Sequence, residues 1–215
     1  MNNDRFGVSI KGVLEHNERL LLRKNERLEY ELLGGRLEKG DPSAEMRLET
    51  EFVEESGIRI KVLRQTEPWL YEIGFSNIII VPFMCQALEI PDVLVDEDGG
   101  TLHWITKKSI NGLFLPQGYK DSIHEDIPHK CYSIPAKKYF KVIPNYVERN
   151  YFVELRATEN GKDLFALPLP HHIAPRDLLF RELGESYKDA IALAQPIGID
   201  YERDTITLNY DIGLQ

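Results

Sequence analysis

The sequence predicts an α+β protein, and three observations lead to that class. Between residues 5 and 106, short segments rich in Val, Ile, Leu and aromatic residues are separated by turn residues, which is typical of β-strands. Residues 43–56 contain neither Pro nor Gly and space their apolar side chains as an amphipathic helix does. Residues 128–215 show both patterns again, so we predict a small α+β extension with apolar faces of its own.

Strands are predicted on both sides of the helix at residues 43–56. Before it, residues 5–26 are expected to form two strands around a turn at His16 and Asn17, and residues 30–33 form a short strand that runs into two glycines. Further elements are expected after the helix: strands at residues 58–74, 76–90 and 101–106, a short helix near 107–113, and a helix at 116–125 that begins with Pro116.

The extension is predicted to contain two hairpins and one helix. Residues 150–169 form two alternating segments joined through Asn160-Gly161, which is a type I′ turn signal. Residues 174–196 have the pattern of one amphipathic helix. Residues 197–211 are expected to form the second hairpin.

The helix at residues 43–56 is crowded with carboxylates near its end. Asp41 or Ser43 can serve as its N-cap, and Gly57 is the expected C-terminal stop. Helical spacing brings together three acidic side chains at i, i+3 and i+4, namely Glu51, Glu54 and Glu55. Each like-charge pair costs about 0.2–0.5 kcal/mol. An acidic run alone is most often a solvated face. The alternative is a bound divalent cation, since hard cations take oxygen ligands.

Composition and charge limit the partners. A chain of 215 residues can bury the core of one large domain or of two small ones. A net charge of −9 argues against nonspecific binding to nucleic acid or anionic membranes, because both rely on basic surfaces. Two cysteines are too few for a disulfide framework, and the polar start of the sequence has no secretory signal pattern. We therefore expect a cytoplasmic protein.

Residues 30–58, YELLGGRLEKGDPSAEMRLETEFVEESGI, resemble the Nudix box. That pattern is Gly, five residues, Glu, seven residues, and then Arg-Glu-apolar-any-Glu-Glu-any-Gly-apolar. Gly35 fits the first glycine of the box, which spans residues 35–58 here. The residues that match its closing half are Glu51, Phe52, Glu54, Glu55, Gly57 and Ile58. The sequence is thus similar to the Nudix family over about residues 5–125.

Two positions depart from the family pattern, and both affect one contact. Thr50 stands where the family has Arg, and the early Glu appears as Asp41, with eight rather than seven residues between it and Thr50. In the family these two positions interact and brace the loop against the helix. Arg47 lies one turn before Glu51, so it can brace that carboxylate instead.

The resemblance implies a fold, an activity and a cofactor. The fold is a mixed β-sheet with flanking helices at residues 1–127, followed by the α+β extension at residues 128–215. The activity is hydrolysis of a phosphoric anhydride bond in a nucleoside diphosphate linked to another moiety, such as a nucleotide sugar or an ADP-ribose-like compound. Mg²⁺ or Mn²⁺ would neutralise the pyrophosphate and activate the attacking water. The implied metal ligands are Glu51, Glu54, Glu55 and the carbonyl group of Gly35.

Two carboxylates are candidates for the base that deprotonates the water. Glu54 is one by its position in the box. Glu97 is the other, because several Nudix enzymes draw a base from the corresponding loop. The acidic segment at residues 96–98 is, in the alternative interpretation, a solvated turn.

Three arginines flank the same end of the predicted sheet. Arg23, Arg27 and Arg36 can bind phosphate oxygens, although each can equally be an ordinary surface charge. The expected partner is a small nucleotide derivative rather than nucleic acid or a membrane. The extension can also form the interface of a homodimer.

Two other functions share the predicted fold. A catalytically weak Nudix-fold protein that senses or regulates through a bound nucleotide is favoured by the departures at Thr50 and Asp41. A diphosphate isomerase of the isoprenoid type needs a cysteine placed for proton transfer. Cys85 lies within an apolar strand, which does not suit that role.

Overall fold

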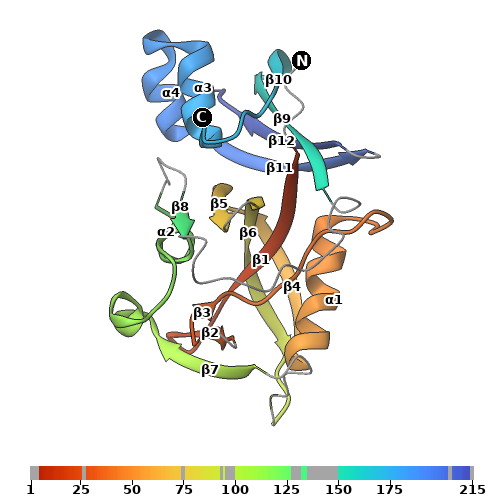
Figure 1. The fold of residues 1–215 in the computed structure, drawn as a ribbon, viewed down its shortest axis with the longest axis vertical. Coiled ribbons are helices and arrows are strands. Elements are labelled where there is room, and N and C mark those ends of the chain that lie inside the picture. The colour runs from red at the N-terminus through yellow and green to blue at the C-terminus, as the bar shows by residue number, and fades with distance from the viewer. Residues whose placement is uncertain are drawn as a thin grey trace. The chain divides into compact units, whose positions relative to one another are not determined.

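The computed structural model describes the chain at residues 5–25, 28–73, 76–92, 94, 100–126, 132–134, 150–202 and 205–213. Two compact units are distinguished by their internal contacts. The box unit consists of residues 9–66 and 81–126, and the terminal unit of residues 1–8, 67–80 and 127–215. Figure 1 gives the labels of their elements.

The box unit is built from antiparallel strand pairs. Its strands are β1 (Phe6–His16, from Ser9 onward), β2 (Arg19–Lys24), β3 (Tyr30–Glu31), β4 (Arg59–Gln65), β6 (Ser76–Glu89, from Val81 onward) and β7 (Thr101–Thr106). Strand β2 pairs with β1, β3 and β7, and β4 pairs with β6. Two isolated bridges, Ser9 to Arg36 and Gly12 to Leu33, join β1 to the segment after β3.

Three helices complete the box unit: α1 (Ala44–Ser56), the 3₁₀ helix η1 (Lys107–Gly112) and α2 (Gln117–His124). Ser43 is the N-cap of α1, because its hydroxyl oxygen accepts a hydrogen bond from the backbone N–H of Met46 at 3.1 Å. Gly57 ends the helix with φ 71°, a left-handed conformation that glycine adopts without a Cβ penalty. The predicted caps at both ends are therefore confirmed. Helix α1 packs beside β4 (Figure 1).

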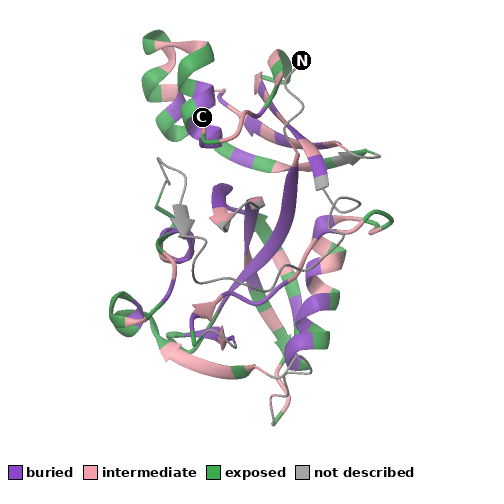
Figure 2. Cartoon of the chain, viewed as in Figure 1, coloured by how far each residue is buried: buried purple, intermediate pink, exposed green. Residues whose placement is uncertain are grey.

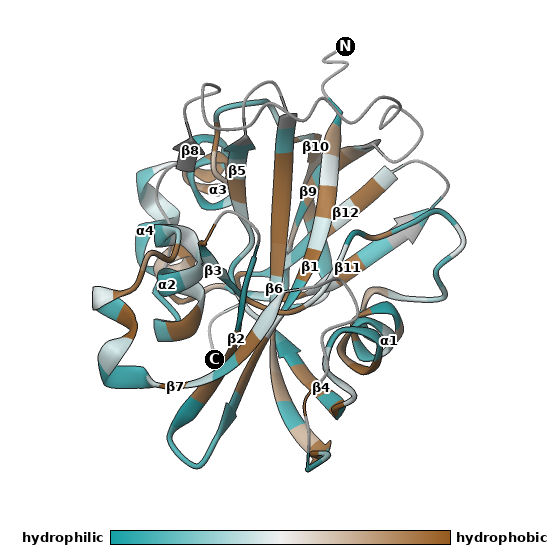
Figure 3. Cartoon of the chain, turned by 60° about the horizontal axis from the view of Figure 1, so that its bottom comes forward, coloured by the Kyte–Doolittle hydropathy of each residue, from teal (hydrophilic) through white to brown (hydrophobic). Residues whose placement is uncertain are grey.

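Glycine at position 12 allows β1 and α1 to approach closely. Strand β1 is buried through Leu14 (purple in Figure 2), and the hydropathy of α1 alternates between its faces (Figure 3). A Cβ atom at Gly12 would lie 2.4 Å from a ring carbon of Phe52. Other side chains of the box unit that are almost completely buried are Ile10, Leu14, Leu20, Leu22, Leu48 and Phe83.

We expect Gly12→Ala to lower the free energy of unfolding by about 1–3 kcal/mol, because the added methyl group overpacks the contact with Phe52. Urea unfolding measures the change, and Phe52→Leu in the same chain should recover part of it. Gly112→Ala is the matched control, since a Cβ there meets nothing within 4 Å. Equal stability of the two alanine variants would contradict the expectation.

The terminal unit pairs its strands in both directions. Its elements are β5 (Trp69–Ile73), β8 (Tyr132–Ile134), β9 (Asn150–Glu159), β10 (Lys162–Pro168), α3 (Pro175–Leu183), η4 (Glu185–Tyr187), α4 (Lys188–Leu193), β11 (Gln195–Glu202) and β12 (Thr205–Asp211). Strands β10 and β11 are antiparallel to β9 and β12 respectively, whereas β12 is parallel to β9 and β8 is parallel to β5. The predicted turn between β9 and β10 is present, with Asn160 and Gly161 at φ 51° and 74°.

A buried ion pair joins three parts of the terminal unit. Arg176 on α3 donates hydrogen bonds from Nε and Nη2 to the carboxylate of Glu67, and the Tyr210 hydroxyl on β12 donates to the same carboxylate at 2.8 Å. Arg176 Nη1 also donates to the carbonyl oxygens of Ile191 and Ala194. The side chains of Glu67 and Arg176 are 8% and 6% exposed. We call these three residues the Glu67–Arg176–Tyr210 cluster.

The structure confirms the predicted α+β class with a mixed sheet and flanking helices, and it corrects two elements. The single strand region predicted at residues 58–74 is divided into β4 and β5, and Pro68, which has no backbone N–H to pair, lies in the break. The single helix predicted at residues 174–196 is divided into α3, η4 and α4. The division falls at Gly184, whose φ of 75° and ψ of −173° lie far from helical values and are open to glycine alone. The division of the chain at residue 127 stays a prediction. Among the described residues, no helix is long and apolar enough to span a membrane.

Candidate active site

The glycine loop (residues 34–40) is attached to β1 by backbone hydrogen bonds. Ile10 N donates to Gly35 O, and Gly12 N donates to Leu33 O, each at 2.9 Å. Gly34 has φ 121°, and a Cβ atom there would lie 2.4 Å from the carbonyl oxygen of Ile10. Glycine is therefore required for the loop to lie this close to β1.

Glu55 faces the glycine loop from α1. Its Oε2 accepts a hydrogen bond from Gly34 N at 2.8 Å, and the residue is 7% exposed. Burial raises the pKa of Glu55 from 4.5 to about 7, although the positive charge of Lys11 and the Gly34 N–H lower it. Burial thus outweighs the positive charge that surrounds this carboxylate.

Glu51 lies one turn earlier on the same face of α1 and is 8% exposed. A Cβ atom at Gly35 would lie 1.9 Å from Glu51 Oε1, so the carboxylate lies directly against this glycine. Burial raises the pKa of Glu51, and the charge of Arg47 and a hydrogen bond from it act in the opposite direction. We call Glu51 and Glu55 the carboxylate pair.

Glu54 lies on the exposed side of α1 and shares Arg47 with Glu51. Its side chain is 53% exposed, and Arg47 Nη1 lies 3.6 Å from its Oε2. Residues four apart share a helix face, whereas residue 54 lies about 100° around the helix from residue 55. The structure therefore brings Glu51 and Glu55 together at the glycine loop and leaves Glu54 on the solvent side.

The brace predicted for Arg47 is confirmed. Its guanidinium donates a hydrogen bond to Glu51 Oε1, one turn along α1. The two residues that depart from the family pattern have local roles. Thr50 donates to the carbonyl oxygen of Met46 at 3.0 Å on the exposed face, and Asp41 accepts a hydrogen bond from Glu38 N at 2.7 Å within the loop.

The remaining predicted residues are placed as follows. Arg23 forms an ion pair with Glu31 at 3.0 Å. Arg36 is half-buried and forms a backbone bridge to Ser9. The Gly35 carbonyl accepts from Ile10 N and from Ser9 Oγ. Arg27 and Glu97 lie outside the described residues.

Lys11 is a residue of this site that sequence reasoning missed. It lies on β1, is 8% exposed, and its Nζ donates a hydrogen bond to the carbonyl oxygen of Gly34. A signal for it exists in the sequence, since Lys11 is the one charged residue in the predominantly apolar strand segment VSIKGVL. Lysine is rarely buried without a partner, so its position within such a strand indicates a specific one.

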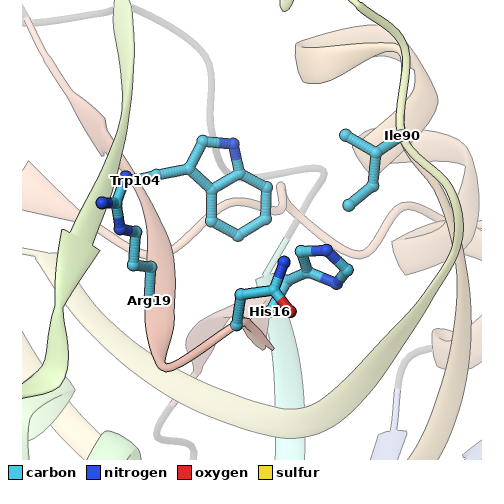
Figure 4. Close-up of a pocket in the computed structure, with 5 residues that line it drawn as sticks. His16, Arg19, Ile90 and Trp104 are labelled. Carbon is cyan, nitrogen blue, oxygen red and sulfur yellow. The ribbon is translucent and has the colours of Figure 1, made fainter.

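A separate hollow of about 500 Å³ lies at the turn between β1 and β2. It is lined by His16, Asn17, Arg19, Ile90 and Trp104. Figure 4 shows the rings of His16 and Trp104 on its wall, with centroids 6.0 Å apart. None of the lining residues belongs to the glycine loop or to α1, so the hollow is distinct from the carboxylate pair.

The carboxylate pair fits a divalent cation in its donor chemistry. Carboxylate oxygens are the ligands that Mg²⁺ and Mn²⁺ prefer, and both pKa values are raised by burial. Over the residues that the structure describes, no group of three or more His, Cys, Asp or Glu side chains is gathered closely enough to hold a metal ion. The structure thus presents two carboxylates beside the loop, with further ligands still to be supplied.

Comparison with known proteins identifies the fold. No protein-family model matches the sequence, and no curated protein matches it either. Among solved structures, the chain is similar to a mutator MutT protein from Bacillus halodurans, with 18% identity, a TM-score of 0.51, and 62% of this chain and 94% of that chain covered. A Nudix hydrolase from Nitrosomonas europaea has 18% identity, a TM-score of 0.50 and coverages of 56% and 87%. A MutT protein from Methanosarcina mazei Go1 has 18% identity, a TM-score of 0.50 and coverages of 58% and 94%.

The fold is therefore that of the Nudix hydrolases. The resemblance that the sequence shows over the box is confirmed at the level of the fold.

Proposed function

We propose that this protein is a metal-dependent Nudix pyrophosphohydrolase that cleaves a nucleoside diphosphate linked to another moiety. The observation that carries the proposal is the carboxylate pair, buried against the glycine loop within a Nudix fold. A divalent cation bound by both carboxylates would offset the stability cost of burying two acids on one helix face.

Glu51 and Glu55 would hold Mg²⁺ or Mn²⁺, with Glu54 and the Gly35 carbonyl as further candidate ligands. When bound, the cation would neutralise the pyrophosphate and activate water. Arg47 keeps the Glu51 carboxylate oriented toward Gly35, and Gly34 N holds one oxygen of Glu55. These contacts fix both carboxylates before substrate binds, which reduces the entropy lost on binding.

Glu54 and Glu97 remain the two candidates for the general base. Glu54 is supported by its exposure, because a solvent-facing carboxylate can accept a proton from water and release it to solvent. For phosphate binding, Arg23, Arg27 and Arg36 remain the candidates. Arg23 is already paired with Glu31, so phosphate binding by it would compete with that ion pair.

The expected partner remains a small nucleotide derivative. The net charge of −9 supports a site that uses a metal ion, rather than a basic surface, to neutralise phosphate. A cytoplasmic location and a possible homodimer stay predictions from the sequence.

A hydrolysis screen tests the proposal. With Mg²⁺ or Mn²⁺, we expect turnover of at least one member of a panel of ADP-ribose, dinucleoside polyphosphates, NADH, nucleotide sugars and nucleoside triphosphates. Glu55→Gln should lower kcat by at least about 100-fold, since neutralising the carboxylate removes charge from the metal site. Phosphate-containing products are measured by chromatography.

Glu49→Gln is the matched control, because it makes the same chemical change on α1 away from the carboxylate pair. Its turnover should equal that of the unaltered chain. A Glu55→Gln variant as active as the Glu49→Gln variant would refute the site.

A nucleotide sensor is the second candidate function. The buried Lys11 favours it, because a side-chain cation already compensates the carboxylates. If no panel member were hydrolysed but one of them raised the melting temperature of the protein, the result would support the sensor. The isomerase alternative has no such support, since burial raises the pKa of the Cys85 thiol to about 12 and keeps it protonated.

A further inference from the structure

A buried ammonium group lies at the candidate metal site. The side chain of Lys11 extends from β1 to the glycine loop, where Nζ donates a hydrogen bond to Gly34 O. Transfer of an ammonium ion out of water costs several kcal/mol unless nearby negative groups compensate it. Glu55 contacts the same glycine through Gly34 N, and Glu51 Oε1 lies against Gly35, so these two carboxylates are placed to supply the compensating negative charge.

The ammonium group and the carboxylate pair act on each other through space. Lys11 lowers the pKa of both carboxylates, and for Glu55 it is the largest of the influences that favour the charged form. Gly34 links the two sides directly, since its N–H donates to Glu55 and its carbonyl accepts from Lys11. A cation that approaches the pair from the glycine loop therefore meets a positive charge already in place.

We propose that Lys11 is the resident cation of the carboxylate pair and sets the affinity of the site for divalent metal ions. A divalent ion bound by Glu51 and Glu55 is repelled by the ammonium group unless that group moves away from Gly34. The inference rests on the proposed function and deepens it, because it names the residue with which the metal competes.

The same contact would stabilise the fold in the absence of metal. Two buried carboxylates with no cation would repel each other and lose their hydration. Lys11 and Arg47 supply positive charge from the chain itself. Removal of Lys11 should therefore have opposite effects on the metal-free protein, which becomes less stable, and on metal binding, which becomes tighter.

Titration of the full-length protein with Mn²⁺, followed by calorimetry and by the electron paramagnetic resonance signal of free Mn²⁺, tests the proposal. Lys11→Met removes the charge and keeps the length of the side chain. We expect its Kd for Mn²⁺ to be lower than that of the unaltered protein by at least about tenfold. Lys11→Arg keeps the charge, so its Kd should stay within about twofold of the unaltered value.

Two further variants secure the comparison. Lys11→Gln removes the charge but retains a donor for Gly34 O, so it serves if the methionine variant does not fold. Lys61→Met makes the same change at an exposed position of β4 and should leave the Kd unchanged. Melting temperatures give a second readout: Mn²⁺ should raise that of Lys11→Gln by more than that of the unaltered protein.

The outcomes separate this inference from the proposed function. Equal Mn²⁺ affinity of the unaltered protein, Lys11→Met and Lys11→Gln would overturn the role of Lys11 and leave the hydrolase proposal intact. Tighter Mn²⁺ binding by the charge-removing variants, with no hydrolysis by any of the proteins, would support the role of Lys11 and overturn the hydrolase proposal. Absence of Mn²⁺ binding in all of them would overturn both.

Discussion

Arg176→Met is expected to lower the free energy of unfolding by about 3–5 kcal/mol, because it leaves the Glu67 carboxylate buried without its cation. The guanidinium also donates to the carbonyl oxygens of Ile191 and Ala194, and both lose this donor in the variant, although Ile191 O keeps the hydrogen bond from Ala194 N. Equilibrium unfolding in urea, followed by circular dichroism, measures the loss. Glu67→Gln in the same chain should restore part of it, because the uncompensated charge is then removed.

Arg156→Met is the matched control within the terminal unit. Arg156 forms an ion pair with Asp163 on the neighbouring strand β10, and the two side chains are 41% and 60% exposed. Exposed pairs contribute about 0–1 kcal/mol, so the control should lose little stability. If Arg176→Met were no more destabilised than Arg156→Met, the cluster would not have the structural importance that we assign to it.

Glu55→Gln should stabilise the metal-free protein at pH 8. The pKa of Glu55 is 4.5 in its ordinary state and about 7 in the folded protein, so folding favours the protonated form. The stability that this group contributes is fully present below pH 4.5 and is lost as the pH rises through 7. A pKa difference of this size lowers the free energy of unfolding by about 3 kcal/mol between pH 4.5 and pH 8.

Urea unfolding in the presence of a chelator, repeated across this pH range, measures the effect. The unaltered protein should lose stability toward pH 8, and Glu55→Gln should lose about 3 kcal/mol less. Glu54→Gln is the comparison, because it makes the same chemical change at a carboxylate that is 53% exposed. Parallel curves for all three proteins would show that Glu55 is not buried as described.

The sequence predicted the features of this fold that depend on neighbouring residues. Ser43 and Gly57 end α1 through local hydrogen bonds and backbone angles, and the Asn160-Gly161 turn requires only its own dihedral angles. The brace between Arg47 and Glu51 is also local, since the helix places residues four apart on one face.

Features that depend on distant contacts escaped prediction. Lys11 meets Gly34 across 23 residues, and Glu67 meets Arg176 and Tyr210 across 109 and 143 residues. No periodicity in the sequence relates such positions, because they become neighbours only after the strands have paired. The position of Glu54 was also not predictable from local sequence. Helical spacing groups it with Glu51 and Glu55, but the packing of α1 decides which of these carboxylates face the glycine loop.

The terminal unit is built from three separate segments of the chain, and this limits where the chain can be truncated. That unit joins residues 1–8 and 67–80 to residues 127–215, and Glu67 has its partners on α3 and β12. A polypeptide shortened after residue 127 would retain Glu67 but lose both partners, and Trp69 would be left without the later strands of its unit. We therefore expect residues 128–215 to be needed for the folding of residues 67–80. Loss of activity after such a truncation would report damage to folding and would not locate the substrate site.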